Sequence, residues 1–148
     1  EGGQAGGLAM VPLRVEQVAA LAAEVKRDGK PAIEDPLVRD QLVRFAIEER
    51  GFELSGARAR VTGLGGPRPF AVPLMSKLRM SEFRRRLCQF AVQLQGANAN
   101  LYVGDPHAYA DGSWQRGYMN AFSATIGGGT SQIQLNIIGE RVLGLGKG

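Results

Sequence analysis

The chain has 148 residues and a formal net charge of +4 at pH 7, with 44% hydrophobic and 22% charged residues. This composition is typical of one globular domain with its own core, and no apolar run approaches the roughly 20 residues that cross a bilayer. The single cysteine, Cys88, excludes an internal disulfide and a multi-cysteine metal site. Its apolar neighbours predict a core position. We expect a cytoplasmic protein with no membrane partner.

Nucleic-acid and metal binding have little support in the sequence. Three consecutive arginines at 84–86 form the conspicuous basic run, but it does not continue as a stripe with interleaved aromatic residues. A solvated helix face with salt bridges is the simpler interpretation. The only histidine, His107, lies in a predicted loop and has no second histidine or partner cysteine for a metal site or a nucleophilic triad. We expect no nucleic-acid partner and no metal.

The first helix is predicted after a glycine-rich lead over residues 1–10. Apolar residues then recur at spacings of four and three, the pattern of one face of an amphipathic helix. They are Val11, Val15, Val18, Ala22 and Val25. Asp28 and Gly29 supply the stop of this helix.

A long second helix is predicted to begin at Asp35 and Pro36. Asp35 can accept a hydrogen bond from a free backbone N–H, and Pro36 lacks the N–H that would stay unpaired. The helix has two apolar stripes, Val38, Leu42, Phe45 and Phe52 in the first and Ile47, Leu54 and Val61 in the second. Two stripes predict contact with more than one neighbour. Breakers at 63–69 end the pattern.

A third helix is predicted from about 73 to 95, with one apolar face made of Met80, Phe83, Leu87, Phe90 and Leu94. The segment 96–112 is rich in Gly, Asn, Asp and Pro and reads as a loop. Asp111 is expected to cap a fourth helix. The fourth helix carries Trp114, Tyr118 and Phe122, and we assign Trp114 and Tyr118 to the core.

The end of the chain places three glycines, Gly127 to Gly129, directly before a last predicted helix. That helix begins at Thr130, and its apolar residues pair four apart, Ile133 with Ile137 and Ile138 with Val142. The glycines are either a plain turn or a point where the backbone must pass close to a ligand. No stretch alternates with period two, so strands are not predicted. The sequence predicts an all-α fold, an antiparallel bundle of four to five helices.

Three segments of this bundle resemble a known family. GGTSQIQLNIIGERVLGL at 128–145 is similar to the C-terminal signature of the flavin-dependent acyl-CoA dehydrogenases. The similarity extends to WQRGYMNAFSATI at 114–126 and to FAVQLQGANA at 90–99. The resemblance implies that residues 1–148 are the C-terminal helical domain of a longer flavoenzyme, whose N-terminal helical domain and middle β domain are absent here.

The resemblance also implies which residues form the site. The glycine loop and the following helix start would lie beside the flavin and the substrate thioester. Thr130, Ser131 and Gln132 would contact FAD, and Gly129 would lie along the acyl thioester. N–H groups at a helix start suit a pyrophosphate or a polarised carbonyl oxygen. The structural alternative is that Thr130 is only an N-cap.

A second group of residues matches the family stretch that reaches the flavin of a neighbouring subunit. Its members are Gln93, Gly96 and Ala97, and the alternative is that Gly96 only ends a helix. A further family pattern, an Arg, then Phe-Gly, then a Gln, is not present between 24 and 45. Arg27 and Gln41 are only loosely placed for it, so the sequence leaves that half of the inter-subunit site unassigned.

The family's catalytic base is the clearest departure. The reaction removes a proton from the carbon beside the thioester carbonyl, while hydride leaves the next carbon for the flavin. A carboxylate takes the proton, and many members have a Glu directly before the Gly-Thr of the signature. Here Gly128 stands at that position, so no catalytic residue is assigned. Other members carry the base on the first helix of this domain, where only Glu1 is near, at a frayed end.

Two functions therefore stay open. The first is the C-terminal domain of an acyl-CoA dehydrogenase, which forms part of the FAD and acyl-CoA site and the interface of a homo-oligomer or mixed tetramer. The second is a non-catalytic helical oligomerisation subunit or domain of a related complex, which Gly128 favours slightly. In either case we expect the isolated chain to be inactive, because most of the flavin-holding surface of the family lies outside it.

Overall fold

The structure, a computed structural model, describes residues 14–61, 63–64 and 71–146. Its helices are α1 (Val15–Glu24), α2 (Pro36–Ala59), α3 (Ala71–Leu94), α4 (Ser113–Ile126) and α5 (Ser131–Ile137), which continues as π-helical turns over Ile138–Leu143. Short 3-10 turns cover Ala32–Glu34, Gly96–Asn100 and Tyr109–Gly112. The predicted all-α bundle is confirmed. None of the described helices is both long and apolar enough to span a membrane.

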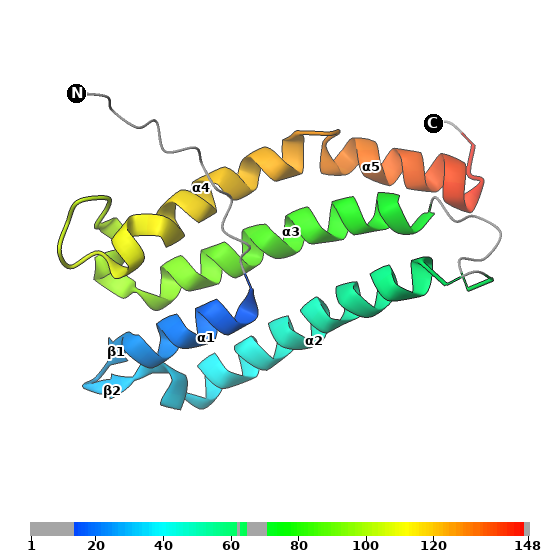
Figure 1. The fold of residues 1–148 in the computed structure, drawn as a ribbon. Helices are drawn as coiled ribbons and strands as arrows, with labels where there is room; N and C mark the ends of the chain where they lie inside the picture. Colours follow the sequence, from blue (N-terminus) through cyan, green and yellow to red (C-terminus); the bar gives the residue numbers. More distant parts are fainter. Residues whose placement is uncertain (1–13, 62, 65–70, 147–148) are drawn as a thin grey trace, which may run out of the picture.

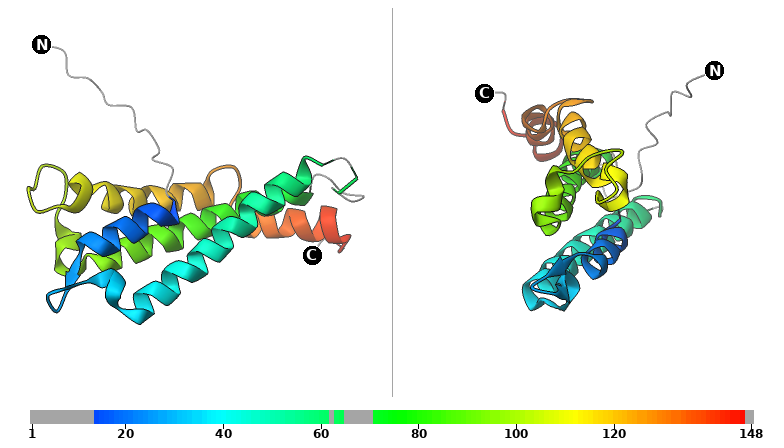
Figure 2. Two further views of the ribbon diagram at one scale, coloured as in Figure 1. Left: turned by 60° about the horizontal axis from the view of Figure 1, so that its bottom comes forward. Right: turned by 90° about the vertical axis from the view of Figure 1, so that its left-hand side faces the viewer.

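The long helix α3 lies at the centre of the bundle. Figure 1 shows α2 on one side of α3 and the line formed by α4 and α5 on the other, with α1 beside α2. The views in Figure 2 agree, and α3 contacts each of the other four helices. The two ends of α3 therefore meet different neighbours, which determines where the candidate site residues lie.

A two-stranded hairpin follows α1. Strand β1 (Lys26–Arg27) pairs antiparallel with β2 (Lys30–Pro31). The two residues between them, Asp28 and Gly29, have φ angles of 50° and 79°. An Asp-Gly pair with positive φ at both positions is the standard two-residue hairpin turn. The prediction without strands missed this hairpin, because two residues are too few to show alternation.

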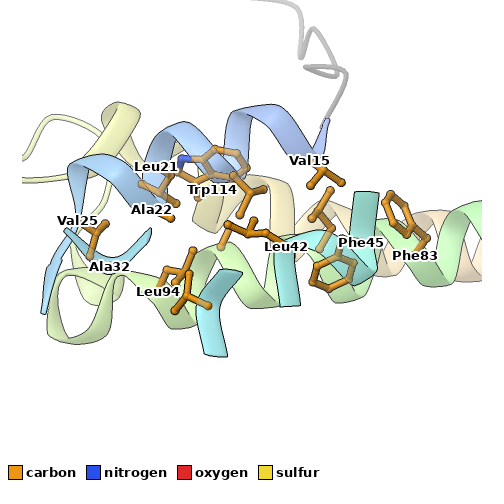
Figure 3. Packing of buried hydrophobic residues seen from close by; sticks show 14 residues of the cluster. Val15, Leu21, Ala22, Val25, Ala32, Leu42, Phe45, Phe83, Leu94 and Trp114 are labelled. Atoms are coloured by element: carbon orange, nitrogen blue, oxygen red, sulfur yellow. The ribbon is translucent and has the colours of Figure 1, made fainter. Parts of the chain in front are cut away.

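The core is built by one face each of α1, α2 and α3, with Trp114 from α4 (Figure 3). The first stripe of α2 lies in it as predicted, because Val38, Leu42 and Phe45 are buried. Phe45 meets Phe83 of α3 edge to face, with ring centroids 5.8 Å apart. Burial of such side chains supplies the main stabilisation of the bundle. Met80 departs from the prediction, because it is 41% exposed.

The second stripe of α2 faces outward in the single chain. Ile47, Leu54 and Val61 are 68%, 55% and 50% exposed. Val61 also lies beyond the last residue of α2. The predicted contact of this stripe with a second neighbour is therefore not made within the described residues.

The start of α4 differs from the prediction. The residue that precedes this helix is Gly112, with φ of 67°, and no side chain caps the helix. Asp111 instead accepts a hydrogen bond from the N–H of Gly104 at 2.9 Å and closes the loop before it. The prediction that Asp111 caps α4 is wrong. Gly112 is required here because an added Cβ would lie 3.0 Å from the backbone nitrogen of Val103.

The apolar pattern of the last helix does not describe its packing. Ile133 is 51% exposed, whereas Gln134, the next residue, is buried. Trp114 of α4 is buried as predicted, and Tyr118 is half-buried, with its ring edge to face against Phe122 at 5.2 Å. The apolar residues of α5 therefore add to the exposed surface of the described chain.

Candidate functional site

The triple glycine forms the connection between α4 and α5. Gly127 closes α4, because its N–H donates to the carbonyl of Ser123 at 2.7 Å. Gly128 and Gly129 then have φ angles of 69° and 97°, a region that disfavours residues with a Cβ. A Cβ on Gly129 would lie 2.9 Å from Nε2 of Gln134, whereas one on Gly128 would meet only Cε of Lys77 at 3.8 Å. Gly129 is thus the sterically demanding position.

Two side chains hold the carbonyls of this loop. The ammonium of Lys77, from α3, donates to the carbonyl oxygen of Gly129. The side-chain amide of Gln134, from α5, donates to the carbonyl oxygen of Gly128 at 2.8 Å. Gln134 is buried, so its amide depends on this bond in place of water. Neither side chain was a predicted site residue, and no sequence pattern pairs residue 77 with residue 129.

At the start of α5, the hydroxyl groups of Thr130 and Ser131, two of the predicted site residues, each make a hydrogen bond. Thr130 is the N-cap of α5, because its Oγ1 accepts from the N–H of Ile133 at 3.2 Å. Ser131 donates to a carboxylate oxygen of Glu82 on α3 at 2.7 Å. Gln132 is exposed and points to no described partner. Glycine loop and helix start thus form one continuous surface element against α3.

Glu82 is the carboxylate that touches this element. The pKa of Glu82 is lowered, mainly by the hydrogen bond from Ser131; burial opposes this shift, and Arg85, whose Nε lies 3.3 Å away, lowers the pKa further. A carboxylate with a lowered pKa is a weaker base. Gly128 itself carries no side chain, and Glu1 lies outside the described residues. Within the described ranges, no group of three His, Cys, Asp or Glu residues could hold a metal ion.

The second predicted group lies at the other end of α3. Gln93 is on its last turn, and Gly96, with φ of 56°, and Ala97 follow in the 3-10 turn. At 1.5 Å rise per residue, the 11 positions from Glu82 to Gln93 correspond to roughly 16 Å. Within one chain, the predicted residues at the start of α5 and those at the end of α3 therefore form two separate sites.

Gln93 lines a groove of about 490 Å³ between the hairpin, the start of α2 and the end of α3. Arg27 reaches into it and donates to the carbonyl oxygen of Gln93 at 3.4 Å. Gln41 lines the same groove, together with the aromatic side chains of Phe45 and Phe90. The two residues that the sequence placed only loosely, Arg27 and Gln41, are thus brought beside Gln93 by the fold.

A buried pair of amides joins this end of α3 to α4. Gln115 donates to the side-chain oxygen of Gln95 at 3.1 Å and to the carbonyl of Leu101 at 2.9 Å. Gln95 in turn donates to the carbonyl of Ala91 at 3.1 Å. Both glutamines are buried. The turn at 96–100, which holds Gly96 and Ala97, is thereby fastened to two helices.

Comparison with known proteins agrees with this architecture. The model of the acyl-CoA dehydrogenase C-terminal domain matches residues 3–143. The acyl-CoA dehydrogenase IpdE1 of Mycolicibacterium smegmatis is 35% identical over 131 residues, and IpdE1 of Mycobacterium tuberculosis is 36% identical over 114. These alignments cover 81% and 77% of this chain and 28% of each relative.

A solved structure shows the same arrangement of helices. It is the crystal structure of the ChsE4-ChsE5 complex from Mycobacterium tuberculosis, with a TM-score of 0.74 and 25% sequence identity. The alignment covers 90% of this chain and 35% of the matched chain. The chain belongs to the acyl-CoA dehydrogenase family. Within that family it corresponds to the C-terminal helical domain, and it spans about a quarter of the length of the curated relatives it matches.

Proposed function

We propose that this chain supplies one wall of the flavin and thioester site of an acyl-CoA dehydrogenase. The observation that carries the proposal is the glycine loop at 127–129. Its carbonyls are held against α3 and α5, and Gly129 has a conformation that excludes side chains. A backbone held in this way can approach a planar ring or a thioester closely. The family membership supports FAD as the cofactor of the intact protein.

Each predicted residue has a role in this proposal. Thr130, Ser131 and Gln132 contact the flavin at the start of α5, and Gly129 lies along the acyl thioester. When bound, the flavin supplies the acceptor for the hydride that leaves the acyl chain. The backbone at Gly129 orients the thioester. Gly128 offers no carboxylate, so the base that takes the proton stays unassigned in this proposal.

The groove at the other end of α3 serves the flavin of a neighbouring subunit in this proposal. Gln93, Gly96 and Ala97 contribute to it, and the fold adds Arg27 and Gln41. The guanidinium of Arg27 suits a phosphate oxygen, and the amide of Gln41 can donate to and accept from a ribose or a flavin ring. The chemistry of the groove therefore fits one portion of FAD.

Flavin retention by the intact protein tests the cofactor assignment. We expect the purified protein to be yellow, and Arg27→Ala to raise the dissociation constant for FAD about tenfold, the loss expected for one charge-assisted hydrogen bond. Arg44→Ala is the matched control, since Arg44 is exposed and pairs only with Asp40 within its own helix. A colourless wild-type protein would favour the non-catalytic oligomerisation function instead.

Assembly is the second part of the proposal. The exposed stripe of Ile47 and Leu54 on α2 is covered by another subunit, in a homo-oligomer or a mixed tetramer, since a matched structure is itself a complex. Burial of several hundred Å² of apolar surface stabilises the complex by roughly 25 cal/mol per Å². The loss of translational and rotational entropy on association offsets part of this free energy. In sedimentation velocity, Ile47→Lys and Leu54→Lys together are expected to shift the assembly toward smaller species. An unchanged distribution would remove this stripe from the interface. We also propose that the assembled protein is cytoplasmic.

A further inference from the structure

We propose that Lys77 and Gln134 are positioning residues that fix the conformation of Gly128 and Gly129. The inference rests on the proposed function, because it concerns the wall that this loop presents to the thioester. Neither residue touches the ligand in this scheme. They act through the two peptide units that they hold from behind.

The direction of the two loop carbonyls determines the direction of the two N–H groups that follow them. The carbonyl of Gly128 faces the amide of Gln134, and the carbonyl of Gly129 faces the ammonium of Lys77. No described peptide bond is cis, so the C=O and N–H of each unit point in opposite directions. The N–H groups of Gly129 and Thr130 therefore point away from the two side chains. Each of these two donors thus faces away from the side chain that holds the carbonyl of its own peptide unit.

Two features hold the loop in this conformation: Gln134 is buried, and the two side chains come from different helices. Gln134 is 6% exposed, and its Oε1 has no hydrogen-bond partner in the part of the chain that is described. Its Nε2 would lose its acceptor too if the peptide after Gly128 turned over, and a buried amide without partners is costly. Lys77 comes from α3 and Gln134 from α5, so the loop is fastened to two helices at once.

The side chains of Gln134 and Lys77 also lie close to the positions that a Cβ would occupy on residues 129 and 128. Gln134 occupies the space where a side chain on residue 129 would begin, 2.9 Å from the position of a Cβ. Lys77 passes beside residue 128, with its Cε 3.8 Å from the corresponding Cβ position. The side chains that hold the loop thus lie on the side of the glycines where a Cβ would project.

The test uses the intact protein and four variants. Lys77→Met and Gln134→Met each remove the donor and keep much of the side-chain volume, since a thioether has no N–H or O–H to donate. Lys77→Arg keeps a charged donor and is the rescue variant. Arg44→Met removes one positive charge from an exposed position on α2 and is the charge-matched control.

Two readouts separate the positioning role from the proposed function. The first is amide hydrogen exchange in the peptide 123–135, which holds the N–H groups of Gly127 and Gln134 on either side of the loop. Lys77→Met and Gln134→Met should speed this exchange about tenfold, the effect of losing one hydrogen bond on local opening. The second is kcat/KM for acyl-CoA with the absorption spectrum of the bound flavin. Both should change in these two variants and stay near wild type in Lys77→Arg and Arg44→Met.

The outcomes divide clearly. Faster exchange with lower kcat/KM and a shifted flavin spectrum supports the positioning role. Unchanged exchange in both donor-free variants overturns it, whatever the activity does. Faster exchange with wild-type kcat/KM and spectrum also overturns it, because the contacts would then be only structural. A wild-type protein without flavin contradicts the proposed function, and hydrogen exchange then decides by itself whether Lys77 and Gln134 hold the loop.

Discussion

Gly128 and Gly129 are neighbours with different steric demands. A Cβ on Gly129 would press against Nε2 of Gln134 at 2.9 Å, whereas one on Gly128 has room. Gly129→Val is therefore expected to destabilise the chain by about 2 to 3 kcal/mol, and Gly128→Ala by about 1 kcal/mol from its positive φ alone. Urea denaturation of the 148-residue chain checks this order. Equal effects of the two substitutions would mean that the contact with Gln134 does not restrict the loop.

Cys88 is a buried thiol on α3, and burial raises its pKa to about 11, with Arg84 opposing the shift. Unfolding returns the thiol to its ordinary pKa near 9. The folded state then holds the proton while the unfolded state loses it. Stability should therefore be full below about pH 9 and fall as pH rises toward 11, by about 2 to 3 kcal/mol.

The pH dependence of unfolding tests this assignment. Cys88→Ala should lack the part of the alkaline loss that comes from the thiol, although it costs stability at every pH through the space it leaves. The native thiol should also react with an aromatic disulfide at least a hundredfold more slowly than the unfolded one. Rapid reaction in the folded state would show that Cys88 is reachable, in conflict with its burial.

At the scale of elements, the Asp35-Pro36 motif determines where α2 begins. Asp35 accepts from the N–H of Leu37 at 2.8 Å, and Pro36 occupies the first helical position. Asp35→Ala should destabilise the chain by about 1 kcal/mol. The control is Asp40→Ala, which removes only an exposed pair with Arg44 and should cost less than about 0.5 kcal/mol. Similar losses for both would remove the capping role.

Local signals predicted the elements but not their neighbours. The Asp35-Pro36 start of α2 and the cap at Thr130 rest on contacts within a few residues, and the structure confirms both. Asp111 had the same local signal, yet the fold uses its carboxylate to close the loop at Gly104. The local pattern could not decide between two acceptor roles for one side chain.

Contacts across the sequence explain the rest of the difference. Lys77 and Gly129 lie 52 positions apart, and Arg27 meets Gln93 across 66, so no spacing rule finds them. In α5, the apolar spacing predicted a helix but not which side faces inward: Ile133 is exposed, whereas Gln134 is buried and donates to the loop carbonyl of Gly128. The contact of Gln134 with the loop could not be found from apolar periodicity.

At the scale of the whole molecule, the proposed assembly would cover apolar surface that the described chain leaves exposed. Its exposed apolar residues include Ile47 on α2, Met119 on α4 and Leu135 on α5. One candidate site region contacts α3 at Lys77 and Glu82, and the other lies at its C-terminal end beside Gln93, so the two reach no common centre within the described chain. We therefore expect the isolated chain to bind FAD more weakly than about micromolar, since too few contacts remain to offset the loss of ligand freedom. Flavin fluorescence titration measures this, and a dissociation constant below about micromolar, or about 8 kcal/mol of binding, would contradict it.

The central claim is that this domain forms part of a site that oxidises an acyl thioester with a bound flavin. Anaerobic addition of saturated acyl-CoA thioesters of increasing chain length to the intact protein tests it most directly, with the flavin absorption spectrum as the readout. We predict that at least one thioester bleaches the oxidised flavin band and yields an enoyl-CoA product in equal amount. A protein whose bound flavin keeps its oxidised spectrum with every thioester, while dithionite still reduces it, would contradict the claim.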